Sequence, residues 1–127
     1  MALEAISAEQ EARFESAVRA FHAGSLGKLA WSPLRMGWSK VLEKYAAGSG
    51  KVLERPARTF WDDTFTTVFP EGVSMAVYRY GFFEEEVTRV LLGHLKPGMT
   101  FFDVGAHFGY FSTLAARLVG EGGSVHS

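Results

Sequence analysis

The stretch TFFDVGAHFGYFS, residues 100–112, decides how the sequence is interpreted. It lies across the end of a short continuous apolar run, Met99–Val104, which is typical of a parallel strand covered on both faces. The acid Asp103 stands at the end of that run, and two glycines follow at Gly105 and Gly109. A strand that enters a helix through a glycine-containing loop is the opening of a doubly wound α/β sheet.

The segments on either side of this stretch fit the same architecture. Apolar residues recur at helical spacing over 83–95, and the turn Lys96–Gly98 ends that helix. A second helical pattern covers 108–119 and stops at Gly120, after which the residues EGGSVHS resemble the start of another strand. Residues 81–127 are therefore expected to form an incomplete Rossmann-like sheet: first strand, glycine loop, helix and the start of a second strand.

Two further segments are predicted upstream. Residues 1–50 read as a helical appendage, with one helix over 7–22 and another beginning at Ser32, and GSG at 48–50 reads as a flexible break. The apolar face expected for the second helix consists of Leu34, Trp38, Val41, Leu42 and Tyr45. Residues 51–80 are rich in aromatic and β-branched residues, and RTFW, FTTVF and SMAVYRY predict two or three short antiparallel strands.

Composition excludes several classes of function. The 127 residues carry a formal net charge of −1 with acids and bases interspersed, unlike the basic stripe of a nucleic-acid binder. There is no cysteine, and the four histidines show no metal-ligand spacing. The N-terminus lacks the positive charge and apolar stretch of a signal peptide, and no run approaches the ~20 apolar residues of a membrane span. These features predict a cytoplasmic protein without a membrane span, a bound metal or a nucleic-acid partner.

The loop itself carries the chemistry. Ligands of such sheets bind beyond the carboxyl ends of the strands, where Asp103 and Gly105 stand and where the next helix presents its free N–H groups. An acid there suits an ammonium group and would repel a pyrophosphate. The spacing G-A-H-F-G also differs from G-x-G-x-x-G, so a dinucleotide is disfavoured. The pattern D-x-G-x-x-x-G instead looks like the first motif of the class I S-adenosylmethionine-dependent methyltransferases.

A longer resemblance extends from this loop. Residues 81–126 follow the order and spacing of the FkbM family of methyltransferases, with a Gly-x-x-Glu element, a helix, the turn LKPG, then DVGAHFGY and the exit LVGEGGSV. The resemblance implies an S-adenosyl-L-methionine-dependent enzyme that methylates the hydroxyl of a small molecule or sugar. In-line transfer from a sulfonium depends mainly on alignment of acceptor, methyl group and sulfur. The resemblance to this family assigns no catalytic base in this chain.

The resemblance also assigns roles to the loop residues. Asp103 would interact with the amino group of the cofactor's methionine, directly or through water. Gly105, Ala106 and Gly109 would shape the loop beneath the cofactor through their backbone. His107 stands where the family usually has asparagine. Because both residue types tolerate positive φ, the turn is expected to survive the change, with His107 beside the cofactor or serving conformation alone.

Two residues upstream complete the predicted cofactor site. Glu84, with Gly81, would close over the methionine end. The FEP motif of the family, whose acid binds the ribose hydroxyls, would begin after Ser127. We therefore expect the 127 residues to be the N-terminal portion of a longer methyltransferase, with negligible activity and at best weak cofactor binding alone. Two alternatives stay open: a non-catalytic binding or interaction module, and a fragment of a nicotinamide-cofactor oxidoreductase. The oligomeric state is not predicted.

Overall fold

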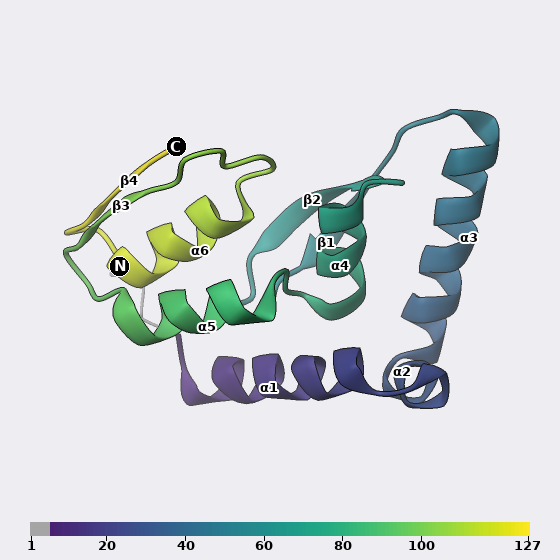
Figure 1. Cartoon of the computed structure of the whole chain (residues 1–127), viewed down its shortest axis with the longest axis horizontal. Coiled ribbons are helices and arrows are strands. Elements are labelled where there is room, and N and C mark those ends of the chain that lie inside the picture. The colour runs from purple at the N-terminus through teal and green to yellow at the C-terminus, as the bar shows by residue number, and fades with distance from the viewer. Residues whose placement is uncertain (1–5) are drawn as a thin grey trace. The chain divides into compact units, whose positions relative to one another are not determined.

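The computed structural model describes residues 6–127 and has a mixed α/β fold (Figure 1). Within those residues it contains six helices and four strands, in two small sheets. The chain divides into two compact units, one formed by residues 10–83 and the other by residues 84–127 together with the segment before residue 10. The first unit therefore contains both the predicted helical appendage from residue 10 onward and the predicted β-rich segment.

A hairpin and its covering helices build the unit 10–83. Its elements are α1 (Ala8–His22, from residue 10 on), α2 (Ser25–Trp31), α3 (Pro33–Ser49), β1 (Leu53–Arg58), β2 (Thr64–Phe69) and α4 (Gly72–Tyr80). Strands β1 and β2 pair antiparallel from Leu53 opposite Phe69 to Arg58 opposite Thr64, which confirms the antiparallel pairing expected here. Helix α4 packs on the hairpin, and α3 runs alongside α4 and β2 (Figure 1).

Aromatic side chains fill the core of this unit. The Phe14 ring of α1 lies with its centroid 5.0 Å from that of Phe60 and 5.3 Å from that of Phe82, and Trp61 has no exposed surface. Edge-on aromatic packing of this kind adds to the large apolar area that such rings remove from water. Trp61 and Phe82 are therefore core residues.

Two segments of this unit differ from their predictions. The residues RTFW, 58–61, were expected to form a strand, but β1 ends at Arg58 and residues 59–61 lie in the connection between β1 and β2. The residues SMAVYRY were expected to form a strand and instead belong to helix α4. The carboxylate of Glu71 accepts hydrogen bonds from the N–H groups of Val73 (2.9 Å) and Ser74 (2.7 Å), which caps the helix. Buried positions then recur at helical spacing, at Ser74, Val77 and Tyr80. Capping and tertiary packing thus outweigh the β propensity of this segment, because propensity is a weak local preference.

Helix α2 is an element that the sequence pattern did not predict. Gly24 is its N-cap residue, and Gly27 lies inside the helix. A Cβ on Gly27 would lie 2.6 Å from the Cβ of Ala23, so the glycine relieves a local contact there. Helix α3 begins at Pro33, directly after the predicted start at Ser32, which is its N-cap residue. It continues to Ser49, so the flexible break predicted at 48–50 is wrong for its first two residues, and Gly50 ends the helix in the left-handed conformation.

The apolar face predicted for α3 is correct at one position and wrong at four. Leu42 is buried and packs with Ala46 and Phe69. Leu34, Trp38, Val41 and Tyr45 are at least half exposed within the described residues. The helix therefore turns a different set inward, including Met36, Ser39 and Ala46, because α4 and β2 contact it on that side.

The unit 84–127 has the predicted order of elements. Helix α5 (Glu85–His94) is followed by β3 (Thr100–Phe102), α6 (Tyr110–Val119) and β4 (Ser124–His126). Strands β3 and β4 are parallel and joined through α6, which lies between the strand pair and α5 (Figure 1). The buried positions of α6 include Leu114, Ala115, Leu118 and Val119, as the sequence predicted. The predicted sequence of helix, strand, glycine loop, helix and strand is thus confirmed.

The strand β3 is less buried than predicted. It was expected to be covered on both faces, but Thr100 and Phe102 are exposed and only Phe101, between them, is half-buried. Successive side chains of a strand point to opposite faces, and among the described residues α6 covers one face. The other face of the β3–β4 pair is therefore open within residues 6–127.

No helix of these residues is long and apolar enough to cross a membrane.

Candidate functional site

The candidate site is the loop of residues 103–109 between β3 and α6. Asp103 follows the last residue of β3, and its N–H donates to the carbonyl of His126 at the end of β4 (2.7 Å). The backbone of the loop is therefore anchored at the carboxyl edge of the parallel pair. In α/β sheets, ligands bind beyond that edge.

The carboxylate of Asp103 is held by a serine of the following helix. The Ser112 hydroxyl donates to Oδ2 of Asp103 at 2.5 Å and lies 2.8 Å from the hydroxyl of Ser127. The Asp103 side chain is half-buried. Since an ionised carboxylate offers about four acceptor positions, the bond from Ser112 orients Asp103 and leaves acceptor capacity for a donor of a ligand.

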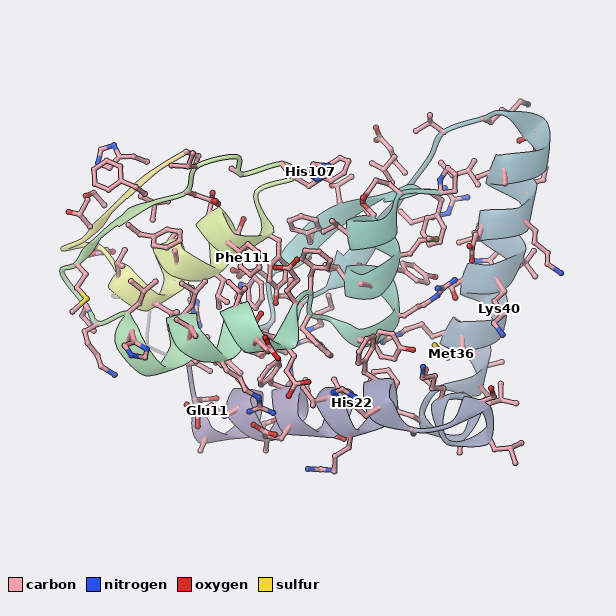
Figure 2. All side chains as sticks on the ribbon, viewed as in Figure 1. Glu11, His22, Met36, Lys40, His107 and Phe111 are labelled. Atoms are coloured by element: carbon pink, nitrogen blue, oxygen red, sulfur yellow. The ribbon has the colours of Figure 1, made fainter. Side chains whose placement is uncertain are left out.

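Three residues of the loop take the left-handed backbone conformation. The φ angles are +80° at Gly105, +51° at His107 and +77° at Gly109. An added Cβ would meet nothing within 4 Å at either glycine, so the conformation, and not close packing within the described residues, favours glycine there. The expected tolerance of His107 for positive φ is confirmed. Its exposed side chain lies on the loop (Figure 2), and its ring centroid is 4.4 Å from that of Phe108.

A tight turn leads from the loop into α6. The Gly109 N–H donates to the carbonyl of Ala106 (2.7 Å), and Thr113 donates to the carbonyl of Gly109 through its N–H (2.9 Å) and its hydroxyl (2.7 Å). The first N–H groups of a helix have no acceptor within that helix and carry partial positive charge. The loop thus brings one carboxylate and one helix N-terminus to the same sheet edge.

Tyr110 and Gly81 have packing roles in this structure. Tyr110 is buried, and its hydroxyl lies 3.2 Å from that of Thr88 on α5, so it packs between α6 and α5. Gly81 ends α4 with φ +76°, and a Cβ there would lie 3.2 Å from the carbonyl oxygen of Arg58 and from the nitrogen of Phe60. Close backbone approach and positive φ therefore both account for the glycine.

Glu84 stands at the start of α5, in the unit that contains the loop. It has φ +45°, it is exposed, and its side chain makes no capping hydrogen bond, although its carbonyl accepts from the Thr88 N–H (3.0 Å). Gly81 belongs to the other unit, residues 10–83. The loop residues 103–109 are thus the part of the predicted site that the structure brings together.

The sequence interpretation missed Ser112 and Ser127. Ser112 is the third residue of α6, and serine near a helix start usually suggests capping of its own backbone. Here its side chain instead reaches back to the end of the preceding strand. The spacing of nine residues between Asp103 and Ser112 carries no recognisable motif, so the pairing depends on how the loop folds.

Neither of two cavities in the structure includes the loop. Each has a volume of about 320 Å³ and is lined by residues of the unit 10–83. Within residues 6–127 no group of three or more histidine, aspartate or glutamate side chains is arranged to hold a metal ion. The recognisable chemistry of the loop is that of Asp103, the two serines and the helix N-terminus.

Comparison of the chain with models of known protein families, with curated proteins and with solved structures gives no match.

Proposed function

We propose that residues 81–127 form the part of an S-adenosyl-L-methionine-dependent methyltransferase that binds the methionine end of the cofactor. The observation that carries the proposal is the loop 103–109: a carboxylate at the carboxyl edge of β3, a positive-φ glycine loop and the N-terminus of α6. The resemblance to the FkbM family supports it. On this proposal β3, α6 and β4 are the first elements of a Rossmann-like sheet.

The donor set suits an amino acid. Methionine carries an ammonium and a carboxylate, and the loop offers a negative group and a partially positive helix terminus at one edge. Asp103 would accept hydrogen bonds from the ammonium while Ser112 fixes its orientation. The open space above Gly105 and Gly109 lets a ligand approach the backbone closely. Ala106 and His107 would line the same turn, and Glu84 would provide a second acid from the start of α5.

In such an enzyme the bound cofactor supplies the methyl group, and the protein aligns the reacting atoms. The role of these residues would be to bind and orient. A carboxylate–ammonium contact fixes one end of the ligand, which limits the positions open to its sulfonium. The proposed acceptor is a small-molecule or sugar hydroxyl, as the family resemblance implies, and no residue of the described chain is assigned as its base.

The proposal is tested by titrating the isotopically labelled chain with S-adenosylhomocysteine and following backbone amide signals. We expect saturable shifts confined to residues around 103–112. Asp103→Asn should weaken binding by about tenfold or more, since a hydrogen bond to a charged group contributes roughly 1.5–3 kcal/mol. Ser112→Ala should weaken it less, because Ser112 acts through Asp103. Glu121→Gln, which removes an exposed carboxylate of the same unit, is the matched control.

The same titration separates the alternatives. Loop amides that do not respond to S-adenosylhomocysteine, or an Asp103→Asn variant that binds as well as the unchanged chain, would contradict the proposal and favour a binding module. Saturable binding of a nicotinamide dinucleotide at the loop with comparable affinity would favour the oxidoreductase alternative.

A further inference from the structure

Charge is unevenly divided between the two units. Residues 10–83 contain ten lysines and arginines against seven acids, a formal charge of +3, whereas the rest of the chain contains three against seven, a formal charge of −4. The near-neutral total of −1 conceals this asymmetry. A positive field attracts anions to the surface that carries it, so an anion site is expected in the basic unit, where this charge is concentrated.

Three arginines from separate elements converge on one cavity of the unit 10–83. Arg13 of α1, Arg35 of α3 and Arg58 of β1 line a cavity of about 320 Å³, and none of its lining residues is acidic. The volume lies at the lower end of the range for small-molecule sites. A guanidinium presents up to five N–H donors in a planar fork that matches the oxygens of a phosphate.

Aromatic rings form another wall of this cavity. Trp31 and Tyr80 stack with their centroids 5.8 Å apart and their planes 24° from parallel. The guanidinium of Arg35 stands over the Trp31 ring, 6.0 Å from its centroid, and makes no ion pair within the described residues. Trp31 is half-buried. The cavity thus brings aromatic rings and guanidinium groups together.

Asp62, which does not line the cavity, binds two of its arginines. Its carboxylate forms ion pairs with Arg13 and with Arg58 (2.8 Å) and accepts a hydrogen bond from Gln10 (3.2 Å). The residue has φ +73°, a conformation that is uncommon outside glycine and often found at functional sites. One carboxylate that does not line the cavity therefore holds two of the arginines that do.

The neighbouring cavity is basic as well. It shares Tyr80 with the first and is lined by Lys28, Lys40 and Arg79. Lys40 lies one turn beyond Met36 on α3 (Figure 2), and the Arg79 guanidinium is bound to Glu43 (2.7 Å) and to the Ser39 hydroxyl (2.8 Å). The two cavities thus place cationic side chains on both sides of one buried tyrosine.

We propose that the arginine-lined cavity binds a small organic anion in which a phosphate monoester is carried by a flat ring. The phosphate would lie against the guanidinium groups of Arg35 and Arg58, and the ring would lie against Trp31 and Tyr80. The size of the cavity suits one such molecule. This site lies wholly within residues 10–83 and does not depend on the function of the loop 103–109.

The experiment uses phenyl phosphate as the probe, with the full chain at low salt. Binding is followed by NMR through the indole N–H of Trp31 and the side-chain N–H of Arg35, with Trp38, which does not line the cavity, as an internal reference. We expect saturable shifts at Trp31 and Arg35 and none at Trp38. Inorganic phosphate should bind about fivefold more weakly, because it lacks the ring contact, and phenol should show no saturable binding.

Variants test whether the arginines of the cavity bind the probe directly or only contribute to the overall positive charge of the unit. Arg35→Gln should weaken phenyl phosphate binding about tenfold, the loss of roughly one charge-assisted hydrogen bond. Arg58→Gln, on a largely exposed side chain, should have a similar effect. Arg55→Gln removes the same charge from β1 at a position outside the cavity and should leave binding unchanged. Circular dichroism confirms that each variant is folded.

Four outcomes would overturn the proposal. One is the absence of saturable shifts at Trp31 up to about 10 mM probe, which corresponds to binding weaker than roughly 3 kcal/mol. If Arg55→Gln and Arg35→Gln weakened phenyl phosphate binding equally, the probe would be attracted only by the overall positive charge of the unit. Inorganic phosphate binding as tightly as phenyl phosphate would exclude the ring contact, and phenol binding as tightly would exclude the phosphate site.

Discussion

The two units of this chain stabilise themselves in different ways. In residues 10–83, rings from α1, from the hairpin segment and from the end of α4 pack together, and Phe14, Trp61, Phe69 and Val77 have almost no exposed surface. In residues 84–127, α6 supplies most of the buried side chains, and the strand β3 has two exposed residues out of three. The first unit has a core built from several elements, whereas the second is one helix, α6, packed between a strand pair and α5.

The difference teaches that the two candidate sites lie in units that are packed to different degrees. The well-packed unit contains the basic cavities, and the sparsely covered unit contains the loop with its carboxylate. A two-stranded sheet covered on one face is at the lower limit of what is stable in water. We therefore expect substitutions to cost more stability in the first unit. The exception is a position of the second unit where an added side-chain atom would clash with neighbouring atoms.

The largest expected effect compares two phenylalanines. Phe14 is 1% exposed and Phe102 is 68% exposed. Phe14→Ala should destabilise the unit 10–83 by about 3–5 kcal/mol, through lost burial and the cavity left behind. Phe102→Ala should change stability by at most about 0.5 kcal/mol. Chemical denaturation followed by circular dichroism measures both. Equal losses would show that the open face of β3 is covered in solution.

A smaller loss of stability is expected on substitution of Gly123, where the second unit is closely packed. An added Cβ would lie 2.5 Å from the Cβ of Val119 and 2.6 Å from the carbonyl oxygen of Met99. Gly123→Ala should therefore cost about 1–3 kcal/mol. Gly93→Ala, inside α5 with nothing within 4 Å, is the control and should stabilise by about 0.5–1 kcal/mol. Amide hydrogen exchange in α6 reports the difference, and a neutral Gly123→Ala would contradict this packing.

The cap of α4 gives the third comparison. Glu71 accepts from two N–H groups of the first turn. Glu71→Ala should cost about 1 kcal/mol, measured by thermal unfolding. Glu71→Gln keeps one oxygen acceptor and should lose about half as much. If both variants behave like the unchanged chain, capping is not the reason why SMAVYRY is helical.

The smallest expected effect at neutral pH concerns Asp62. Burial by itself raises the pKa of Asp62, but hydrogen bonds from Gln10 and Arg13 and the charges of Arg13 and Arg58 outweigh it and hold the pKa below its usual 3.8. A carboxyl whose folded-state pKa is depressed stabilises the fold above its unfolded pKa, and this contribution is lost as the pH falls through the folded-state pKa.

Asp62→Asn should accordingly reduce the difference in stability between pH 7 and pH 3. Asparagine tolerates the positive φ of this position, so the backbone is retained. Glu11→Gln, an exposed acid of α1 labelled in Figure 2, serves as the control. An Asp62→Asn variant with the same pH dependence as the Glu11→Gln variant would show that the ion pairs with Arg13 and Arg58 contribute nothing to folding.

Much of the unit 84–127 could be predicted because its signals are local. The apolar stripe of α6 and the stop at Gly120 come from residues three to four apart or adjacent in sequence. The positive φ at Gly105 and Gly109 likewise follows from residue type. The helix α4 could not be predicted in the same way, because its residues also suit a strand and Glu71 is an unusual cap.

The sequence by itself determined the order of elements after residue 83, the position of the loop and the residue types that shape it. Those features depend on side-chain periodicity and on local backbone preference. Tertiary structure alone decided that Ser112 orients Asp103, that α3 buries a different face from the most apolar one, and that Arg13, Arg35 and Arg58 meet at one cavity. Such pairings join residues far apart in the chain, so they depend on packing that no short stretch encodes.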